Sequence, residues 1–355
     1  MVNQPERVPE DTAQHRAAAV RPWWWVVSAV LLVLAVAVAV TRRDELGKAL
    51  RLIGGADPER LVAAAVLEGV SLLWLAAVQR WLLRAGDSRI GLGTVTAIVL
   101  GANALAGALP GGAAFAAAWV FRQLRKRQVS QALAGAVLVT AGALSSLALF
   151  LLLVAGVLAG GSGGPGAALR PGVLVVAACG AVLVALAYGL SRLRRVRRRA
   201  WRLWRRIGLR SSRLLDIEQS LSRAVRHART VHPGLRPWLG PFAFALLNWL
   251  CDLACLLACA WSLGVGVPWQ GIVTAYALTQ LAGSLRLTPG GLGVVETSLS
   301  ALLTWYGLRA EQAIAVTLLY RTMSYWALQP VGWAALLGLL LPHRRGRHRT
   351  APPPE

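Results

Sequence analysis

The sequence predicts an all-α polytopic membrane protein, and three observations carry that prediction. Hydrophobic residues make up 56% of the 355 residues, and mean hydropathy is +0.55. Several apolar runs exceed the roughly 18 residues that indicate a membrane-spanning helix. The formal net charge of +23 is concentrated in short loops beside those runs, where arginines orient helices and meet anionic headgroups. This distribution argues against nucleic acid as a partner.

Six apolar segments are long enough to cross a bilayer, and each is bounded by charges, by Gly or Pro, or by interfacial Trp. In chain order they are Trp23–Val40, Leu61–Leu83, Ala132–Leu158, Val173–Leu190, Phe242–Leu263 and Ala313–Leu341. They form one integral membrane domain over 22–342, interrupted by a basic loop over 191–236. A polar tail over 1–21 precedes the domain, and a basic, Pro-rich tail over 343–355 follows it.

Two further apolar stretches, Thr94–Phe121 and Gln270–Trp305, each carry Pro-Gly-Gly at mid-length. Proline lacks a backbone donor and glycine has low helix propensity, so a continuous helix is not expected there. We expect each stretch to form a re-entrant hairpin of two half-helices. In the alternative each stretch crosses the membrane twice, which gives eight or more spans. Each loop is assigned to the same side of the membrane in the two topologies, so loop charge does not distinguish between them.

The positive-inside rule assigns the two sides of the membrane. Arg122–Arg127, Arg192–Arg236 and Arg344–Arg349 are strongly basic and are expected in the cytoplasm, together with both termini. The charge-poor loop Gly160–Ala168 then lies outside. Thr41–Arg60 fits less well, because it is placed outside although it holds five basic residues among four acidic ones. We expect a multi-pass protein of the plasma membrane.

The two Pro-Gly-Gly breaks also suggest an internal repeat. They align without gaps at an offset of 179 residues, the separation of Pro110 and Pro289. Each break is followed by an apolar helix, a polar turn and a second long helix, which gives repeat halves at about 61–160 and 240–342. Under the topology above the hairpins enter from opposite sides, as in transporters with inverted repeats. Ala, Leu, Val and Gly also align easily by chance.

Ionisable residues inside apolar segments are the candidate functional residues, because lipid penalises unpaired charge. They are Glu68, Asp252, Glu296 and Arg321, with Arg286 near the second break. Most lie in the second half, and Glu296, Arg286 and Arg321 align with the non-ionisable Ala117, Gly107 and Gly142. The second break is therefore the expected substrate site.

Each buried charge has a functional and a structural interpretation. Glu296 and Arg321 either pair to pin two helices or bind a substrate. In the functional version, free N–H groups after Gly290-Gly291 hold a lipid phosphate, helped by Arg321 or Arg286. Glu296 and Asp252 then meet a cationic or hydroxyl-bearing headgroup. Glu68 and Asp252 would instead serve as helix-to-helix contacts if they are structural.

Three cysteines, Cys251, Cys255 and Cys259, follow one another at a spacing of four along one helix face. No histidine lies within ten residues to complete a metal shell, so we interpret them as small packing residues. We expect neither a metal nor a cofactor.

The residues around the second break resemble a known family. The segment 288–296, Thr-Pro-Gly-Gly-Leu-Gly-Val-Val-Glu, is followed by Tyr306-Gly307-Leu308, then by Leu318-Leu-Tyr-Arg321 and Tyr325-Trp326. This pattern is similar to the transmembrane region of lysylphosphatidylglycerol synthase and to the flippase-like proteins related to it, over about residues 20–345. The resemblance implies lipid translocation. It assigns the site to Pro289, Gly290, Gly291, Gly293, Glu296 and Arg321.

The leading hypothesis is a flippase-like protein that moves a phospholipid or another lipid-linked substrate between leaflets. The expected partners are membrane lipids, either anionic or aminoacylated phospholipid or a polyprenyl-linked lipid, with a second copy or a synthase or transferase as protein partner. No aminoacyl-transferase domain is evident, so no enzyme activity is expected. The alternative is a membrane-embedded transferase, or the membrane subunit of a lipid- or polyprenyl-modifying enzyme, with Glu296 or Asp252 as base. The chain lacks an Asp-x-Asp metal pair and a nucleotide-binding Gly loop. In a third hypothesis the protein is a structural partner.

Overall fold

The computed structural model describes residues 43–108, 111–160, 170–172, 174–175, 236–284 and 288–341. Its contacts divide the chain into a unit over Met1–Asp44 and a unit over Glu45–Glu355, and almost all described residues belong to the second. The expected span Trp23–Val40, most of Val173–Leu190, both polar tails, nearly all of the basic loop, and Arg286 lie outside the described residues.

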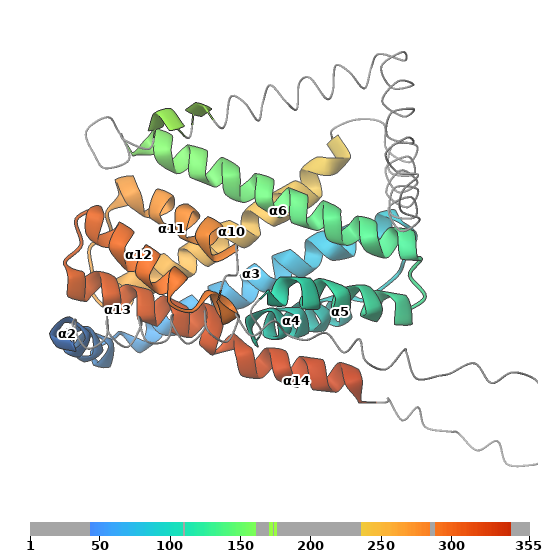
Figure 1. The fold of residues 1–355 in the computed structure, drawn as a ribbon, viewed down its shortest axis with the longest axis horizontal. Coiled ribbons are helices and arrows are strands. Elements are labelled where there is room, and N and C mark those ends of the chain that lie inside the picture. Colours follow the sequence, from blue (N-terminus) through green and yellow to red (C-terminus); the bar gives the residue numbers. More distant parts are fainter. Residues whose placement is uncertain are drawn as a thin grey trace, which may run out of the picture. The chain divides into compact units, whose positions relative to one another are not determined.

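Every described element is helical (Figure 1). The elements are α2 Arg43–Gly54, α3 Pro58–Ala85, α4 Leu92–Ala108, α5 Gly112–Lys126, α6 Gln131–Ala159, α10 Arg236–Ser262, α11 Trp269–Ser284, η2 Pro289–Gly291, α12 Val294–Trp305, α13 Ala310–Arg321, η3 Thr322–Trp326 and α14 Leu328–Leu340. Within the described residues, α3, α6 and α10 are long and apolar enough to cross a membrane. They contain the expected spans Leu61–Leu83 and Ala132–Leu158 and nearly all of Phe242–Leu263.

Local sequence explains where these long helices begin. Asp57 caps α3 by accepting the N–H of Glu59 at 3.0 Å, and Pro58 occupies the first turn, where a missing N–H costs nothing. Ser130 caps α6 in the same way through the N–H of Leu133 at 3.3 Å. A polar capping residue directly before an apolar run thus marks the start of each.

The expected span Ala313–Leu341 is not one uninterrupted α-helix. It is divided into α13, the π-helical turn η3 and α14. A π turn fits one extra residue into a helix and is often found at functional sites. The turn begins directly after Arg321, so it changes the direction in which the residues beyond that arginine project.

Each Pro-Gly-Gly stretch forms two short helices joined at the break. The first pair is α4 and α5, and the second is α11 and α12; the helices of each pair pack on one another. The four helices are 12 to 17 residues long, which is less than the roughly 20 residues needed to cross the hydrocarbon core. None of them is therefore long enough to span the membrane alone.

Helices α3 and α10 pack side by side and run antiparallel (Figure 1). At one end, the N–H of Asp57 donates to Ser262 O at 2.8 Å. At the other end, the rings of Trp81 and Trp238 lie 6.0 Å apart. Residue numbers thus rise along α3 where they fall along α10.

The offset of 179 residues brings the two halves into register element by element. In this alignment α3 corresponds to α10, α4 to α11, α5 to α12, and α6 to α13 together with α14. Gly111 and its counterpart Gly290 both have left-handed backbones, with φ of 67° and 61°. Helices α3 and α10, which correspond at this offset, are the pair that packs antiparallel.

The packing between the halves follows the same correspondence. Helix α6 packs on α11 where Gly156 lies close to the backbone of Thr274, and a Cβ added there would be 2.9 Å from Thr274 N. Helix α14 packs on α4, the corresponding pair, where a Cβ added to Gly332 would be 2.7 Å from Leu100 O. Small residues allow such close approach between apolar helices. The same kind of crossing therefore occurs twice.

Helix α2 lies in the segment Thr41–Arg60, where we expected a loop. Its buried side includes Ala49, and Ile53 packs against the apolar core formed mainly by α10, α11, α12 and α13. Leu50 on the same helix is exposed. The charges of this segment therefore belong partly to an amphipathic helix. The positive-inside rule counts charges in loops, which explains why Thr41–Arg60 fits that rule less well.

Candidate substrate site at the second break

The second break is a compact turn built on glycine. Pro289–Gly291 forms the short helix η2, in which Gly290 has a φ of 61°. Gly293, with a φ of 80°, is the N-cap of α12. The hydroxyl of Thr288 closes the turn by donating to Leu292 O at 2.8 Å. Left-handed backbone of this kind suits glycine because it has no Cβ.

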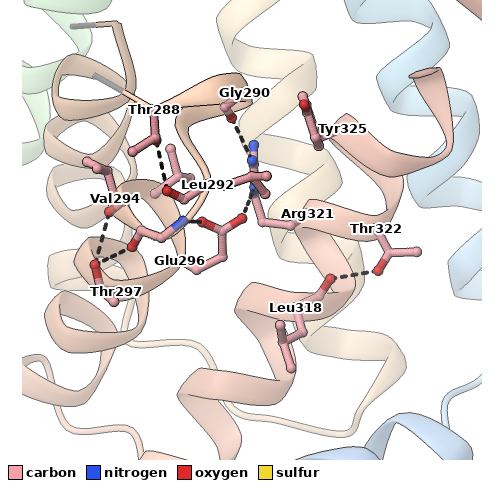
Figure 2. A network of polar contacts seen from close by, with 12 residues as sticks. Thr288, Gly290, Leu292, Val294, Glu296, Thr297, Leu318, Arg321, Thr322 and Tyr325 are labelled. Carbon is pink, nitrogen blue, oxygen red and sulfur yellow. Dashed lines mark hydrogen bonds and ion pairs between the residues drawn. The ribbon is translucent and has the colours of Figure 1, made fainter. Parts of the chain in front are cut away.

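Glu296 lies in the first turn of α12 and caps its own helix. Its Oε2 accepts the N–H of Gly293 at 2.7 Å (Figure 2). A carboxylate at this position satisfies a donor left free by the helix start and interacts favourably with the positive end of the helix dipole. The Gly291 N–H donates to Thr288 O at 3.1 Å. Of the N–H groups after Gly290-Gly291 that were expected to be free for a phosphate, that of Gly293 is thus satisfied within the chain in this conformation.

Arg321, the last residue of α13, reaches across to the break. Its Nε donates to Glu296 Oε1 at 2.7 Å, and its terminal NH2 donates to Gly290 O at 2.8 Å (Figure 2). The Arg321 side chain is 9% exposed and that of Glu296 is 20% exposed. A single carboxylate therefore neutralises the buried guanidinium and caps α12, and the planar guanidinium can make both contacts at once.

Tyr325, in the π turn, connects this network to the first break. Its ring centroid lies 4.5 Å from the guanidinium carbon of Arg321 (Figure 2). Its hydroxyl donates to Gly107 O at 3.0 Å, one residue before the end of α4. A Cβ added to Gly290 would overlap the same hydroxyl. The two breaks thus meet at one tyrosine side chain.

Asp252 forms the centre of a second polar cluster. Its Oδ2 accepts hydrogen bonds from the hydroxyl of Tyr276 and from Gln280 Nε2, each at 2.7 Å. Its Oδ1 accepts the hydroxyl of Tyr320 at 2.7 Å. Glu68 of α3 lies beside Asp252, and its Oε2 is buried without a hydrogen-bond partner among the described residues. The cluster therefore joins α3, α10, α11 and α13.

Asn248, one turn before Asp252, makes a separate contact between helices. Its Nδ2 donates to Ser71 Oγ at 2.7 Å, and Ser71 Oγ donates to Asn248 O at 3.1 Å. At the offset of 179 residues, the counterpart of Ser71 lies close to Asn248 in the sequence, and the counterpart of Asn248 lies close to Ser71. This reciprocal pair therefore joins α3 to α10 near the middle of both helices.

The structure brings most of the predicted site residues together at the second break: Pro289, Gly290, Gly291, Gly293, Glu296 and Arg321. Asp252 and Glu68 belong to the neighbouring cluster, which adjoins the break through the consecutive residues Tyr320 and Arg321. Among the described residues, no three His, Cys, Asp or Glu side chains converge as a metal site requires. Sequence reasoning missed Tyr276 and Tyr320, because single tyrosines in apolar helices are usually core residues.

Comparison with known proteins agrees with the resemblance. A model of the family described as lysylphosphatidylglycerol synthase TM region matches residues 18–332. A UPF0104 membrane protein of Methanothermobacter thermautotrophicus is 29% identical over 91 residues, 26% of this chain and 27% of that protein. An uncharacterized protein of Synechocystis is 41% identical over 86 residues, 23% of this chain and 26% of that protein. The matched stretches thus span about a quarter of each relative.

Proposed function

This chain belongs to the lysylphosphatidylglycerol synthase TM region family of membrane proteins, and from this premise we propose that it moves a phospholipid or another lipid-linked substrate between leaflets. The observation that carries the proposal is the buried network of Arg321, Glu296 and Gly290 at a helix break. A charged network and an interrupted helix inside apolar sequence are both costly in lipid and are typical of substrate pathways.

The network suggests how a headgroup would bind. A phosphate offers the guanidinium of Arg321 the same paired acceptor oxygens as a carboxylate. A lipid phosphate would replace Glu296 at Arg321, and the released carboxylate would meet an amine or hydroxyl of the headgroup. Binding by exchange leaves no charge unpaired in the hydrocarbon, where an isolated ion is most costly.

Alternating access would come from an inverted repeat. The antiparallel packing of α3 and α10, the register of the elements at the offset of 179 residues and the two equivalent close crossings support this arrangement. The short helix pairs then act as re-entrant hairpins whose tips meet near Tyr325. Rocking of one half against the other would open the site to each leaflet in turn, while the lipid tail stays in hydrocarbon.

Charge supports an orientation for this arrangement. Arg84 lies at the end of α3 that carries Trp81, whereas at the other end of α3 Arg60 is paired with Asp57 at 3.2 Å. We propose that the basic end faces the cytoplasm of the cell membrane, with both termini there.

The substrates that fit are anionic or aminoacylated phospholipid and polyprenyl-linked lipid, moved without chemical change. An oligomer or a partner synthase or transferase is compatible with this role.

The test is movement of labelled lipid in proteoliposomes that contain the purified chain. Glu296→Gln and Arg321→Ala are compared with wild type at equal amounts of folded protein. Glu311→Gln is the matched control, because it removes a carboxylate near the start of α13 that pairs with the exposed Arg309 at 3.5 Å. We expect the first two variants to stop lipid movement and the control to retain it. Wild type that moves no anionic, aminoacylated or polyprenyl lipid would refute the proposal, and so would movement that both site variants preserve.

A further inference from the structure

The hydrogen bonds around Asp252 indicate its charge. Three donors, the hydroxyls of Tyr276 and Tyr320 and the amide of Gln280, all point at its two oxygens at 2.7 Å. Several donors converging on one carboxyl group stabilise the ionised form, because an ionised carboxylate only accepts hydrogen bonds. The surroundings of Asp252 are therefore built for a carboxylate.

Glu68 has the opposite surroundings. The residue is 5% exposed, and its Oε2 is buried with no hydrogen-bond donor among the described residues. The carboxyl of Asp252 lies beside it. An ionised Glu68 would place a second negative charge next to Asp252 and leave a buried oxygen unsatisfied. A protonated Glu68 carries no charge and needs only one acceptor, a role that the neighbouring carboxylate of Asp252 would fill.

The groups that face Glu68 offer no positive charge. The titratable side chains near it on the packed helices are Asp252, Cys251, Cys255 and Cys259 of α10, Tyr276 of α11 and Tyr320 of α13. Helices α4 and α6 also pack on α3 and carry no ionisable side chain. Tyr325 of the π turn donates to Gly107 O. Across the described part of the chain, no Lys, Arg or His forms an ion pair with either carboxyl.

We infer that Glu68 and Asp252 form a proton-binding pair, in which Glu68 carries the proton and Asp252 the negative charge. Release breaks the O–H bond of Glu68, and water accepts the proton. Two carboxylates then face each other between α3 and α10, the pair of helices that relates the two halves. Their repulsion favours separation of these helices, so binding and release of a proton would bias the packing of the halves.

The pair also adjoins the substrate site. Tyr320 donates to Asp252, and the next residue, Arg321, holds Glu296 and Gly290. A shift of α13 that weakens one contact would disturb the other. This coupling to transport rests on the proposed function, whereas the proton site itself does not.

Infrared difference spectroscopy of the full chain in lipid nanodiscs tests the site without any transport. We expect wild type at neutral pH to show the carbonyl band of a protonated carboxylic acid, which shifts when H₂O is replaced by D₂O. Glu68→Gln should lose this band. Glu296→Gln should keep it, because Glu296 is paired with Arg321. Tyr320→Phe, a milder change that keeps both carboxyls, should shift the band by removing one donor from Asp252.

Two infrared results would overturn the inference: wild type without the band, or the same band surviving in Glu68→Gln. Proteoliposomes with an imposed pH gradient then test the coupling. Lipid movement should respond to the gradient in wild type and lose that response in Glu68→Gln. If wild type moves no lipid yet shows the band, the proposed function fails and the proton site stands. If lipid moves and the band is absent, the proton site fails and the proposed function stands.

Discussion

The contact between Arg321 and Glu296 leads to the first prediction, because each group compensates the charge of the other in a largely buried place. Arg321→Gln or Glu296→Gln alone leaves the remaining charge unpaired, which we expect to lower the free energy of unfolding by about 3 kcal/mol. The double variant should lose clearly less than the sum of the two. Chemical denaturation of the purified protein measures this, and strictly additive losses would show that the two residues do not interact.

Gly290 and its counterpart Gly111 form a matched pair for the second prediction. Both have a left-handed backbone, with φ of 61° and 67°, but an added Cβ overlaps the Tyr325 hydroxyl only at Gly290 and meets nothing within 4 Å at Gly111. Gly111→Ala should cost about 1 kcal/mol from backbone strain alone. Gly290→Ala should cost more. Thermal denaturation compares them, and equal losses would show that the Tyr325 contact is unimportant.

Individual residues were predicted best where sequence pattern and physical penalty agreed. The carboxylate in the break and the arginine in the last apolar segment were found because both are costly in lipid. Their pairing was one of two interpretations, since spacing along the chain does not give the distance between Glu296 and Arg321. Tyr276 and Tyr320 were missed because their hydroxyls become informative only when Asp252 lies opposite them.

The π turn leads to a prediction at the scale of elements. Tyr325→Phe removes the hydrogen bond from this turn to Gly107 O on α4, and we expect a loss of about 1 kcal/mol in the free energy of unfolding. The matched control is Tyr306→Phe, because the Tyr306 hydroxyl is buried without a hydrogen-bond partner among the described residues. That change should be neutral or stabilising. Equal losses in the two variants would contradict the proposed link between the breaks.

The elements were predicted more completely than their contacts. Helices α3 and α6 contain the expected spans and end within a few residues of them, because apolar runs with capping residues mark both ends. The π turn within 310–340 was missed, since Thr-Met-Ser-Tyr-Trp carries no proline or glycine to signal an interruption. Helix α2 was taken for a loop because hydropathy averages out over a short amphipathic helix.

The proposed inverted repeat gives a prediction for the whole molecule. Ser130 and Arg309 are both exposed, and they are the N-cap residues of α6 and α13, which correspond at the offset of 179 residues. An inverted repeat places them on opposite sides of the membrane. In a background without the four cysteines, Arg309→Cys should react with an impermeant thiol reagent added outside cells. Ser130→Cys should react only after the membrane is permeabilised. Labelling of both from the same side would rule out the inverted arrangement.

The meeting of both breaks at Tyr325 has a thermodynamic consequence. The ring touches the arginine that would hold a headgroup, and the hydroxyl holds the carbonyl at the end of α4. A compound that displaced the tyrosine from Gly107 would alter the arginine site without entering it. Linkage is reciprocal, so the headgroup would change the affinity of that compound by the same factor. Displacement of Tyr325 from the buried Gly107 would therefore weaken lipid binding allosterically, through a compound that need not resemble the lipid.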